Sequence, residues 1–220
     1  MPRALIVHAH PEAASFCTAQ MREAASTLQA QGYKVQISDL YAQGWNAGLD
    51  RSDFTHALDG HFKPQAEQVR AAQDHTFAPD VAAELDKLLA ADLLVFSFPL
   101  WWFSLPALLK GWVDRVFAMG AVYGAGVGTY DAGRFLGRRA LLLFTTGGPE
   151  SAYGPQANNG ELETVLFHIH NGMLRFAGYT VLAPLVGHSP VRVSDDERAA
   201  QLGQVREAFR NLDDRARVFG

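Results

Sequence analysis

The sequence predicts an α/β protein in which a doubly wound, five-stranded parallel sheet carries helices on both faces. Short apolar runs bounded by turn residues alternate with segments whose apolar residues recur every three or four positions. Such an alternation of strands and helices places a parallel sheet between two helical layers. The chain has 220 residues and no repeat or low-complexity tract, so we expect a single domain, 1–220, with a large buried core.

The expected strands are short apolar runs of the kind found in parallel strands that are buried on both faces. Turn residues bound each run, so each is expected to form a separate strand. The runs are Arg3–His8, Lys34–Asp39, Leu93–Phe98, Arg139–Thr145 and Tyr179–Leu185.

Four segments between these strands have the apolar spacing of amphipathic helices. Three of them run from Met21 to Leu28, from Val81 to Leu89 and from Leu162 to Phe176. The fourth carries its apolar stripe from Leu105 to Phe117, and Pro106 lies near its first turn, where a missing N–H costs nothing.

A last helix is expected near the end of the sequence. Ser194 and Glu197 have the spacing of a capping box, which marks a helix N-terminus. The face that this helix buries is expected to contain Leu202, Val205, Phe209 and Leu212.

The segment 41–79 departs from this alternation. It is polar and weakly periodic, and it is too long for an ordinary connection between a strand and a helix. We expect it to be an insert that covers a ligand or contacts a second subunit.

The composition favours a cytoplasmic protein that binds small molecules. A formal net charge of −4 gives no basic excess for nucleic acid. The single cysteine, Cys17, excludes an internal disulfide and suits a reducing compartment. The apolar run at Ala4–Val7 is too short for the core of a signal peptide, and no stretch approaches the roughly 20 apolar residues of a membrane span, so we expect neither export nor membrane insertion.

No metal site is expected. His168 and His170 stand two positions apart on a predicted helix, so they do not share a face, and no third ligand has suitable spacing.

Three unusual loops follow expected strands, and the carboxyl ends of parallel strands meet at one sheet edge, where ligands bind. After the first strand, Ser15 is placed to cap a helix and to offer N–H groups to a phosphate. The aromatic loop Pro99–Phe103 follows the third strand, and Thr145–Gly148 follows the fourth. Taken alone, the loop with Ser15 could be a plain helix cap, and Thr145–Gly148 could be a tight turn. All three loops at one sheet edge favour a binding site for a flavin.

The stretches "ALIVHAHPEAASF", "FPLWWFSLPALLKGWVDRVF" and "TTGGPESAYG" resemble the NAD(P)H quinone oxidoreductase family, also called DT-diaphorase-like. "SDLYA", "AADLLVF" and "GMLRFAGY" are also similar to that family, in order and spacing. The resemblance implies a flavodoxin-like fold, FAD rather than FMN as cofactor, and a homodimer whose interface contains the insert 41–79. The resemblance is to the shorter forms of the family, which do not carry the C-terminal extension of the mammalian members.

The resemblance also assigns residues to the cofactor. The phosphate loop would be formed by His10, Ser15, Phe16 and Cys17. The wall beside the isoalloxazine ring would be formed by Pro99, Leu100, Trp101, Trp102 and Phe103. The polar edge of the ring would be contacted by Thr145, Thr146, Gly147, Gly148 and Tyr153. Arg198 and Lys63 correspond to positions near the adenine half.

Catalytic and substrate residues follow from the same resemblance. Tyr153 matches the family's flavin-side tyrosine, whereas Asn159 stands where its histidine partner is expected. Trp101 would form one side of the substrate slot, and Tyr123 and Phe176 match aromatic residues that the family contributes across the dimer. Ala125 replaces a second family tyrosine, which implies a roomier pocket.

The implied activity is hydride transfer from NAD(P)H to FAD and then to a quinone by a ping-pong mechanism. An azoreductase or nitroreductase would share the cofactor and the site and differ in its acceptor. An ancillary subunit of a potassium-efflux system, which would regulate a membrane partner, and an electron-carrying flavodoxin are the remaining alternatives.

Overall fold

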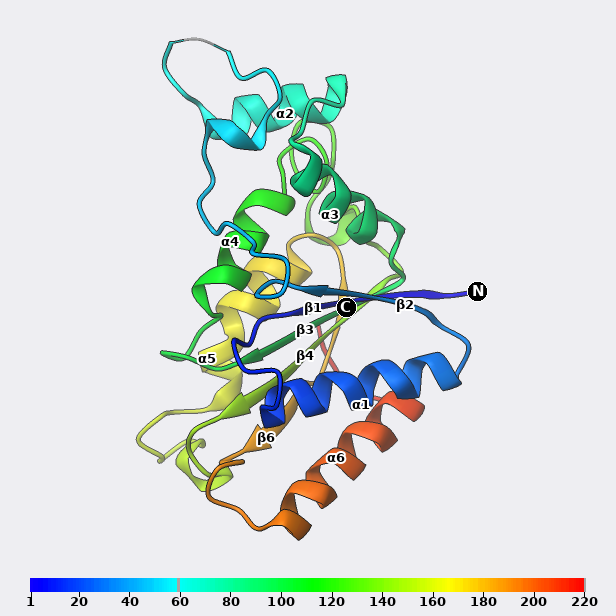
Figure 1. Ribbon diagram of the computed structural model, residues 1–220, viewed down its shortest axis with the longest axis vertical. Coiled ribbons are helices and arrows are strands. Elements are labelled where there is room, and N and C mark those ends of the chain that lie inside the picture. The colour runs from blue at the N-terminus through cyan, green and yellow to red at the C-terminus, as the bar shows by residue number, and fades with distance from the viewer. Residues whose placement is uncertain (59, 220) are drawn as a thin grey trace.

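A computed structural model describes residues 1–58 and 60–219 (Figure 1). Its centre is a sheet with the strand order β2-β1-β3-β4-β5-β7. A further strand, β6, pairs with the later residues of β4, whereas β5 pairs with its first residues. The strands are β1 (Arg3–His8), β2 (Lys34–Asp39), β3 (Leu93–Pro99), β4 (Arg139–Thr146), β5 (Thr180–Leu182), β6 (Leu185–His188) and β7 (Arg217–Phe219). The order 2-1-3-4-5 of the parallel strands is that of a flavodoxin-like doubly wound sheet, which confirms the predicted fold class.

The central strands are buried because their side chains are apolar on both faces. All residues of β3 are buried, as are all but the first residue of β1 and of β4. Strand β1 pairs in parallel with β2 on one edge and with β3 on the other. The winding reverses between β1 and β3, so a ligand crevice is expected outside their carboxyl ends.

The fifth expected strand, Tyr179–Leu185, is interrupted. Strand β5 pairs with β4 at Arg139↔Thr180, whereas β6 pairs with it at Leu143↔Leu185, so the register moves by one residue between them. Pro184 lies at the break and has no N–H to donate, which suits an interruption of the ladder. The sheet therefore differs from the expected five strands, and it also gains β7, which runs antiparallel to β5.

Helices cover both faces of the sheet (Figure 1). Helices α1 (Phe16–Ala30) and α6 (Asp195–Arg210) lie together on one face, and α3 (Pro79–Ala90), α4 (Ala107–Val116) and α5 (Leu162–Ile169) lie on the other. The buried apolar residues fall into two clusters, one under each helical layer. Because β1, β3, β4 and β5 each contribute to both clusters, the sheet edge that carries the loops is held from two sides.

The predicted helix ends agree with the structure at three places. The Ser194–Glu197 capping box is present at the start of α6, and Ser15 caps α1. Pro106 is the N-cap residue of α4. The expected helix from Leu162 to Phe176 is different: α5 ends at Ile169 and continues as a π-helical segment, η4 (His170–Arg175).

The insert 41–79 contains helix α2 (Pro64–Asp74), which the sequence pattern did not predict. Short 3-10 turns occur at η1 (Arg51–Asp53), η2 (Tyr130–Ala132) and η3 (Glu150–Ala152). Buried Arg115 of α4 fixes the insert in place: its Nε lies 2.9 Å from Asp53 Oδ1, and its Nη1 donates to the Asn46 carbonyl at 3.0 Å. The guanidinium also packs over the Trp45 ring at 4.2 Å.

Among the helices that the structure describes, none is both long enough and apolar enough to span a bilayer.

Candidate functional site

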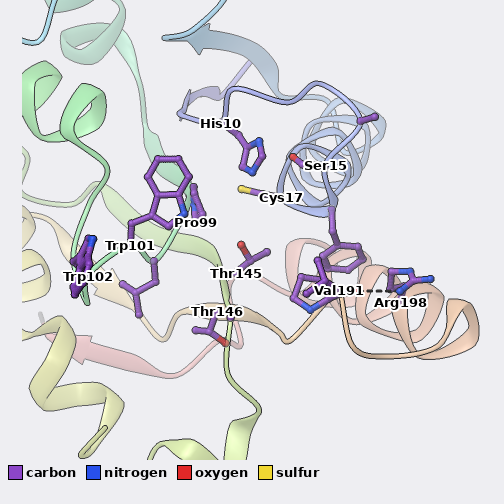
Figure 2. A pocket seen from close by; sticks show the side chains of 15 residues that line it. His10, Ser15, Cys17, Pro99, Trp101, Trp102, Thr145, Thr146, Val191 and Arg198 are labelled. Atoms are coloured by element: carbon purple, nitrogen blue, oxygen red, sulfur yellow. Dashed lines mark hydrogen bonds between the residues drawn. The ribbon is translucent and has the colours of Figure 1, made fainter.

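One cavity of about 990 Å³ opens at the carboxyl ends of β1, β3 and β4, beside the N-terminus of α1 (Figure 2). This is the crevice that the strand order predicts. Its lining residues are His10, Ala14, Ser15, Phe16, Cys17, Pro99, Leu100, Trp101, Trp102, Thr145, Thr146, Gly147, Pro190, Val191 and Arg198.

The N-terminus of α1 gives the cavity an anion-binding end. The Ser15 side chain accepts a hydrogen bond from the Thr18 N–H at 3.1 Å. The loop before it is closed by Glu12, whose carboxylate accepts from the Ala14 N–H at 2.8 Å and whose carbonyl accepts from the Ser15 N–H at 3.1 Å. N–H groups of a first helical turn have no partner within the helix, and together with the helix dipole they favour a phosphate.

Cys17 forms part of the cavity floor. Figure 2 shows its sulfur turned toward the space between His10 and Thr145. Burial raises the pKa of the Cys17 thiol to about 12, against the opposing effect of the Ser97 and Thr145 side chains. The thiol therefore stays protonated at neutral pH and contributes a weakly polar surface rather than a nucleophile.

The aromatic loop forms a wall of the cavity. The Leu100 N–H donates to the Thr145 carbonyl at 2.8 Å, which fixes the start of the loop against β4. The Trp101 side chain is 43% exposed and faces His10, with ring centroids 6.4 Å apart. Trp102 and Phe103 have left-handed φ values of 50° and 59°, which turn the chain sharply.

This turn changes the position of two expected wall residues. Trp102 touches the cavity, but its side chain is 94% exposed and lies at the rim (Figure 2). Phe103 is not among the lining residues. Of the five residues expected to form the isoalloxazine wall, Pro99, Leu100 and Trp101 line the cavity within one chain, Trp102 lies at its edge, and Phe103 does not line it.

The loop after β4 supplies a polar edge. Thr146 Oγ1 donates to the Gly148 carbonyl at 2.8 Å and lies 3.0 Å from His188 Nδ1. Thr145, Thr146 and Gly147 line the cavity, whereas Gly148 does not. A Cβ at Gly147 would meet nothing within 4 Å, so its backbone is open to a ligand.

The two expected catalytic residues, Tyr153 and Asn159, lie just beyond this edge and do not line the cavity. Burial raises the pKa of the Tyr153 hydroxyl, while the Asn159 and Thr146 side chains act in the opposite direction. The Tyr153 ring also lies beside His188, with centroids 6.0 Å apart. Sequence reasoning missed His188, because the fifth strand was expected to end at Leu185.

Arg198 of α6 lies at the far end of the cavity (Figure 2). Its Nη1 donates to the carbonyls of Pro190 and Val193 at 2.9 and 2.6 Å, and the guanidinium pairs with Asp195. Arg198 therefore shapes the loop that brings Pro190 and Val191 to the cavity. These two lining residues and Ala14 were not predicted, and Lys63, the N-cap residue of α2, is not among the lining residues.

Tyr123 and Phe176 line a second cavity, of about 390 Å³. Their rings meet edge to face with centroids 5.5 Å apart, and the Tyr123 hydroxyl accepts from Gln65 Nε2 at 3.2 Å. Within one chain they are separate from the lining of the first cavity.

Within residues 1–58 and 60–219, no three His, Cys, Asp or Glu side chains gather in a way that could hold a metal ion.

Comparison with known proteins gives the same fold and points to one group of enzymes. Residues 2–212 match the model of a family described as having a flavodoxin-like fold. The chain is 38% identical to NAD(P)H dehydrogenase [quinone] 1 of Cavia porcellus, over 99% of this chain and 79% of that protein. It is 39% identical to ribosyldihydronicotinamide dehydrogenase [quinone] of Pongo abelii, over 89% of this chain and 85% of that protein. A solved structure of a candidate quinone reductase from Klebsiella pneumoniae matches with a TM-score of 0.93 and 38% identity, covering 99% of this chain and 87% of that one.

Proposed function

Since the chain belongs to the flavodoxin-like family and to its NAD(P)H quinone reductases, we propose that it is a flavin-dependent NAD(P)H:quinone oxidoreductase. The observation that carries the proposal is the single cavity that combines an anion-binding helix end, an aromatic wall and a polar edge. An anionic ligand with a flat ring system satisfies all three surfaces at once.

The residues present fit a flavin, and they favour FAD over FMN. The cavity extends from the N-terminus of α1 to Arg198 and Val191 of the loop before α6. The second phosphate and the adenine of FAD, which FMN does not have, would occupy the part of the cavity near Val191 and Arg198. When bound, the flavin supplies the hydride chemistry, which no side chain of this chain could provide.

The chain's own residues would bind and orient the cofactor and the substrates. Ser15 and the first N–H groups of α1 would hold the phosphates, and Pro99 to Trp101 would fix the ring plane and keep water from its face. The Tyr153 hydroxyl, whose pKa is raised by burial, stays protonated at neutral pH. It would donate a hydrogen bond where negative charge develops on the ring, with Asn159 as a neutral second donor.

We place both substrates in turn against the face of the ring that Trp101 borders, which is the arrangement of a ping-pong enzyme. Tyr123 and Phe176 would reach this slot from a second copy of the chain, because within one chain they line a different cavity. The proposed enzyme is therefore a homodimer.

A second candidate concerns the hydride donor. Two relatives named ribosyldihydronicotinamide dehydrogenase [quinone], from Pongo abelii and Homo sapiens, are 39% and 38% identical to the chain. NAD(P)H dehydrogenase [quinone] 1 of Cavia porcellus is 38% identical to it, so these relatives are equally similar. A truncated nicotinamide such as N-ribosyldihydronicotinamide is thus the alternative donor.

The purified protein tests the proposal directly. We expect a yellow protein that releases FAD on denaturation, and whose flavin is bleached by a dihydronicotinamide and recoloured by a quinone. Parallel reduction by NADH, NADPH and N-ribosyldihydronicotinamide distinguishes the two donors. A colourless protein that binds no added flavin would rule the proposal out.

A further inference from the structure

We propose that His8, a buried histidine at the end of β1, is a positioning residue that leaves the Ser15 hydroxyl free to bind a phosphate. The inference rests on the proposed function, since it takes the phosphate of a flavin as the ligand of Ser15. His8 does not touch the cavity: its side chain is fully buried and is not among the lining residues. It acts through Thr18, which lies between it and Ser15.

The contacts form one chain beneath the cavity. His8 Nδ1 lies 2.9 Å from Ser97 Oγ of β3, and His8 Nε2 lies 3.1 Å from Thr18 Oγ1 of α1. Thr18 Oγ1 in turn lies 2.9 Å from Ser15 Oγ. Both ring nitrogens of His8 are therefore occupied, and one of them faces the helix start that would hold the phosphate.

The hydrogens in this chain can be assigned by counting donors. The Thr18 hydroxyl has one hydrogen and donates it to the Glu12 carbonyl at 3.1 Å. On this count we assign the ring proton to Nε2, so that the histidine donates to Thr18 Oγ1 and Nδ1 accepts from the Ser97 hydroxyl. Burial lowers the pKa of His8 to about 4, so the ring is neutral at pH 7 and carries only one such proton.

By the same count, the Ser15 hydroxyl is the donor in its contact with Thr18 Oγ1 while no ligand is bound. When a phosphate arrives, that hydrogen can turn toward it, because Thr18 Oγ1 keeps the donor from His8. Without His8, Ser15 would be the only side-chain donor, among the residues that the structure describes, that reaches the buried Thr18 oxygen. The phosphate would then compete with Thr18 for a single hydrogen, and a buried acceptor would lose its partner.

Three substitutions separate this role from simple packing. His8→Leu removes both ring nitrogens, His8→Gln keeps a donor near the position of Nε2, and His8→Asn keeps one only near Nδ1. Each flavin-free, full-length variant is titrated with FAD, FMN and riboflavin, which shares the ring but has no phosphate. We expect His8→Leu and His8→Asn to bind FAD and FMN about tenfold more weakly than the parent, the loss of roughly one hydrogen bond. Riboflavin affinity stays unchanged, and His8→Gln restores most of the FAD affinity.

His170→Gln is the matched control, because His170 is also buried and its pKa is also lowered to about 4, yet it lines neither cavity. It is expected to leave both affinities unchanged. Equal loss of FAD and riboflavin in His8→Leu, or no loss at all, would overturn the inference while leaving the proposed function intact. A parent that binds no flavin would instead overturn the proposed function.

A measurement that needs no flavin tests the same assignment. Nitrogen-15 NMR of the His8 ring reports which nitrogen carries the proton, and we expect Nε2–H in the flavin-free protein. A proton on Nδ1 would give Thr18 no donor from His8 and would contradict the inference.

Discussion

Tyr153 is the residue to which the proposed chemistry assigns the largest role. Its neighbours are the Asn159 amide and His188, and an amide donates a hydrogen bond but gains no proton near neutral pH. Tyr153→Phe removes the hydroxyl and is expected to slow flavin reduction by up to about 100-fold, with little change in FAD affinity. Stopped-flow reduction under single turnover measures the rate. A variant as fast as the parent would move the role to another group.

A substitution of Asn159, the neighbour of Tyr153, tests whether this position ionises in the parent protein. Asn159→His introduces a group that titrates near its unperturbed pKa of about 6.5, so flavin reduction should gain a pH dependence there. The parent should lack it, because burial lowers the pKa of the neighbouring His188 below that value. Reduction rates between about pH 5.5 and 8.5 compare the two proteins. A parent that already titrates near 6.5 would show that another group has the role assigned to Asn159.

Much of the cavity lining could be predicted from single residues. Ser15, Trp101 and Thr146 each follow the end of an apolar run, and parallel strands bring such ends to one edge. Phe103 could not be placed, because its left-handed φ follows from how the loop closes rather than from its residue type. Val191 could not be found either, since the strand before it is interrupted at Pro184.

At the scale of elements, long and strongly patterned segments were predictable and short or polar ones were not. The apolar stripe of α4 and the capping box of α6 both agree with the structure. Helix α2 lies in a polar segment with few buried residues, so the insert gave little periodicity to detect. Strand β7 has three residues and forms through its pairing with β5, a contact distant in sequence.

The contact between α4 and the insert depends on a glycine. A Cβ at Gly111 would lie 2.3 Å from the Ala47 carbonyl oxygen, whereas a Cβ at Gly203 in α6 would meet nothing within 4 Å. Gly111→Ala is therefore expected to lower the free energy of unfolding by about 1–3 kcal/mol through overpacking. Gly203→Ala, the matched control, should raise it by up to about 1 kcal/mol, since alanine favours a helix. Urea denaturation measures both, and a stable Gly111→Ala would show that the insert can move away from α4.

For the whole molecule, two buried histidines should make stability depend on pH. The pKa values of His8 and His170 are both lowered to about 4 by burial, and within residues 1–58 and 60–219 neither ring nitrogen of His170 has a hydrogen-bond partner. Below the unfolded pKa of about 6.5, the unfolded chain takes up protons that the folded chain does not. The free energy of unfolding should therefore fall as the pH drops, by up to about 2 kcal/mol per histidine between about pH 7 and pH 5.

Urea denaturation at the two pH values measures this loss. His170→Leu should reduce it and should not destabilise the protein at pH 7, because it replaces an unpartnered polar ring by an apolar side chain. His61→Gln serves as the control, since His61 is exposed. A loss that is the same in the parent and in His170→Leu would contradict the assignment.

The proposed dimer makes a prediction about how two chains share a site. Tyr153 lies beside the polar edge of the first cavity, whereas Phe176 of the same chain lines the second, so an active site that needs both would take them from different copies. Phe176→Ala alone should raise KM for the quinone about 2- to 10-fold while FAD stays bound, because an aromatic stacking partner contributes about 0.5–1.5 kcal/mol. Steady-state kinetics and the flavin spectrum measure the two effects.

Mixing the variants then tests the geometry. In a heterodimer of Tyr153→Phe and Phe176→Ala chains, one site would carry both substitutions and the other would carry neither, so about half of the parent's activity should return. If both residues served the site of their own chain, each site of the heterodimer would carry one defect and no parental activity would appear. Differently tagged chains allow the heterodimer to be purified, and analytical ultracentrifugation checks that it is a dimer. A monomer with full turnover would contradict the shared site, because Phe176 would then have no route to the cavity that Trp101 borders.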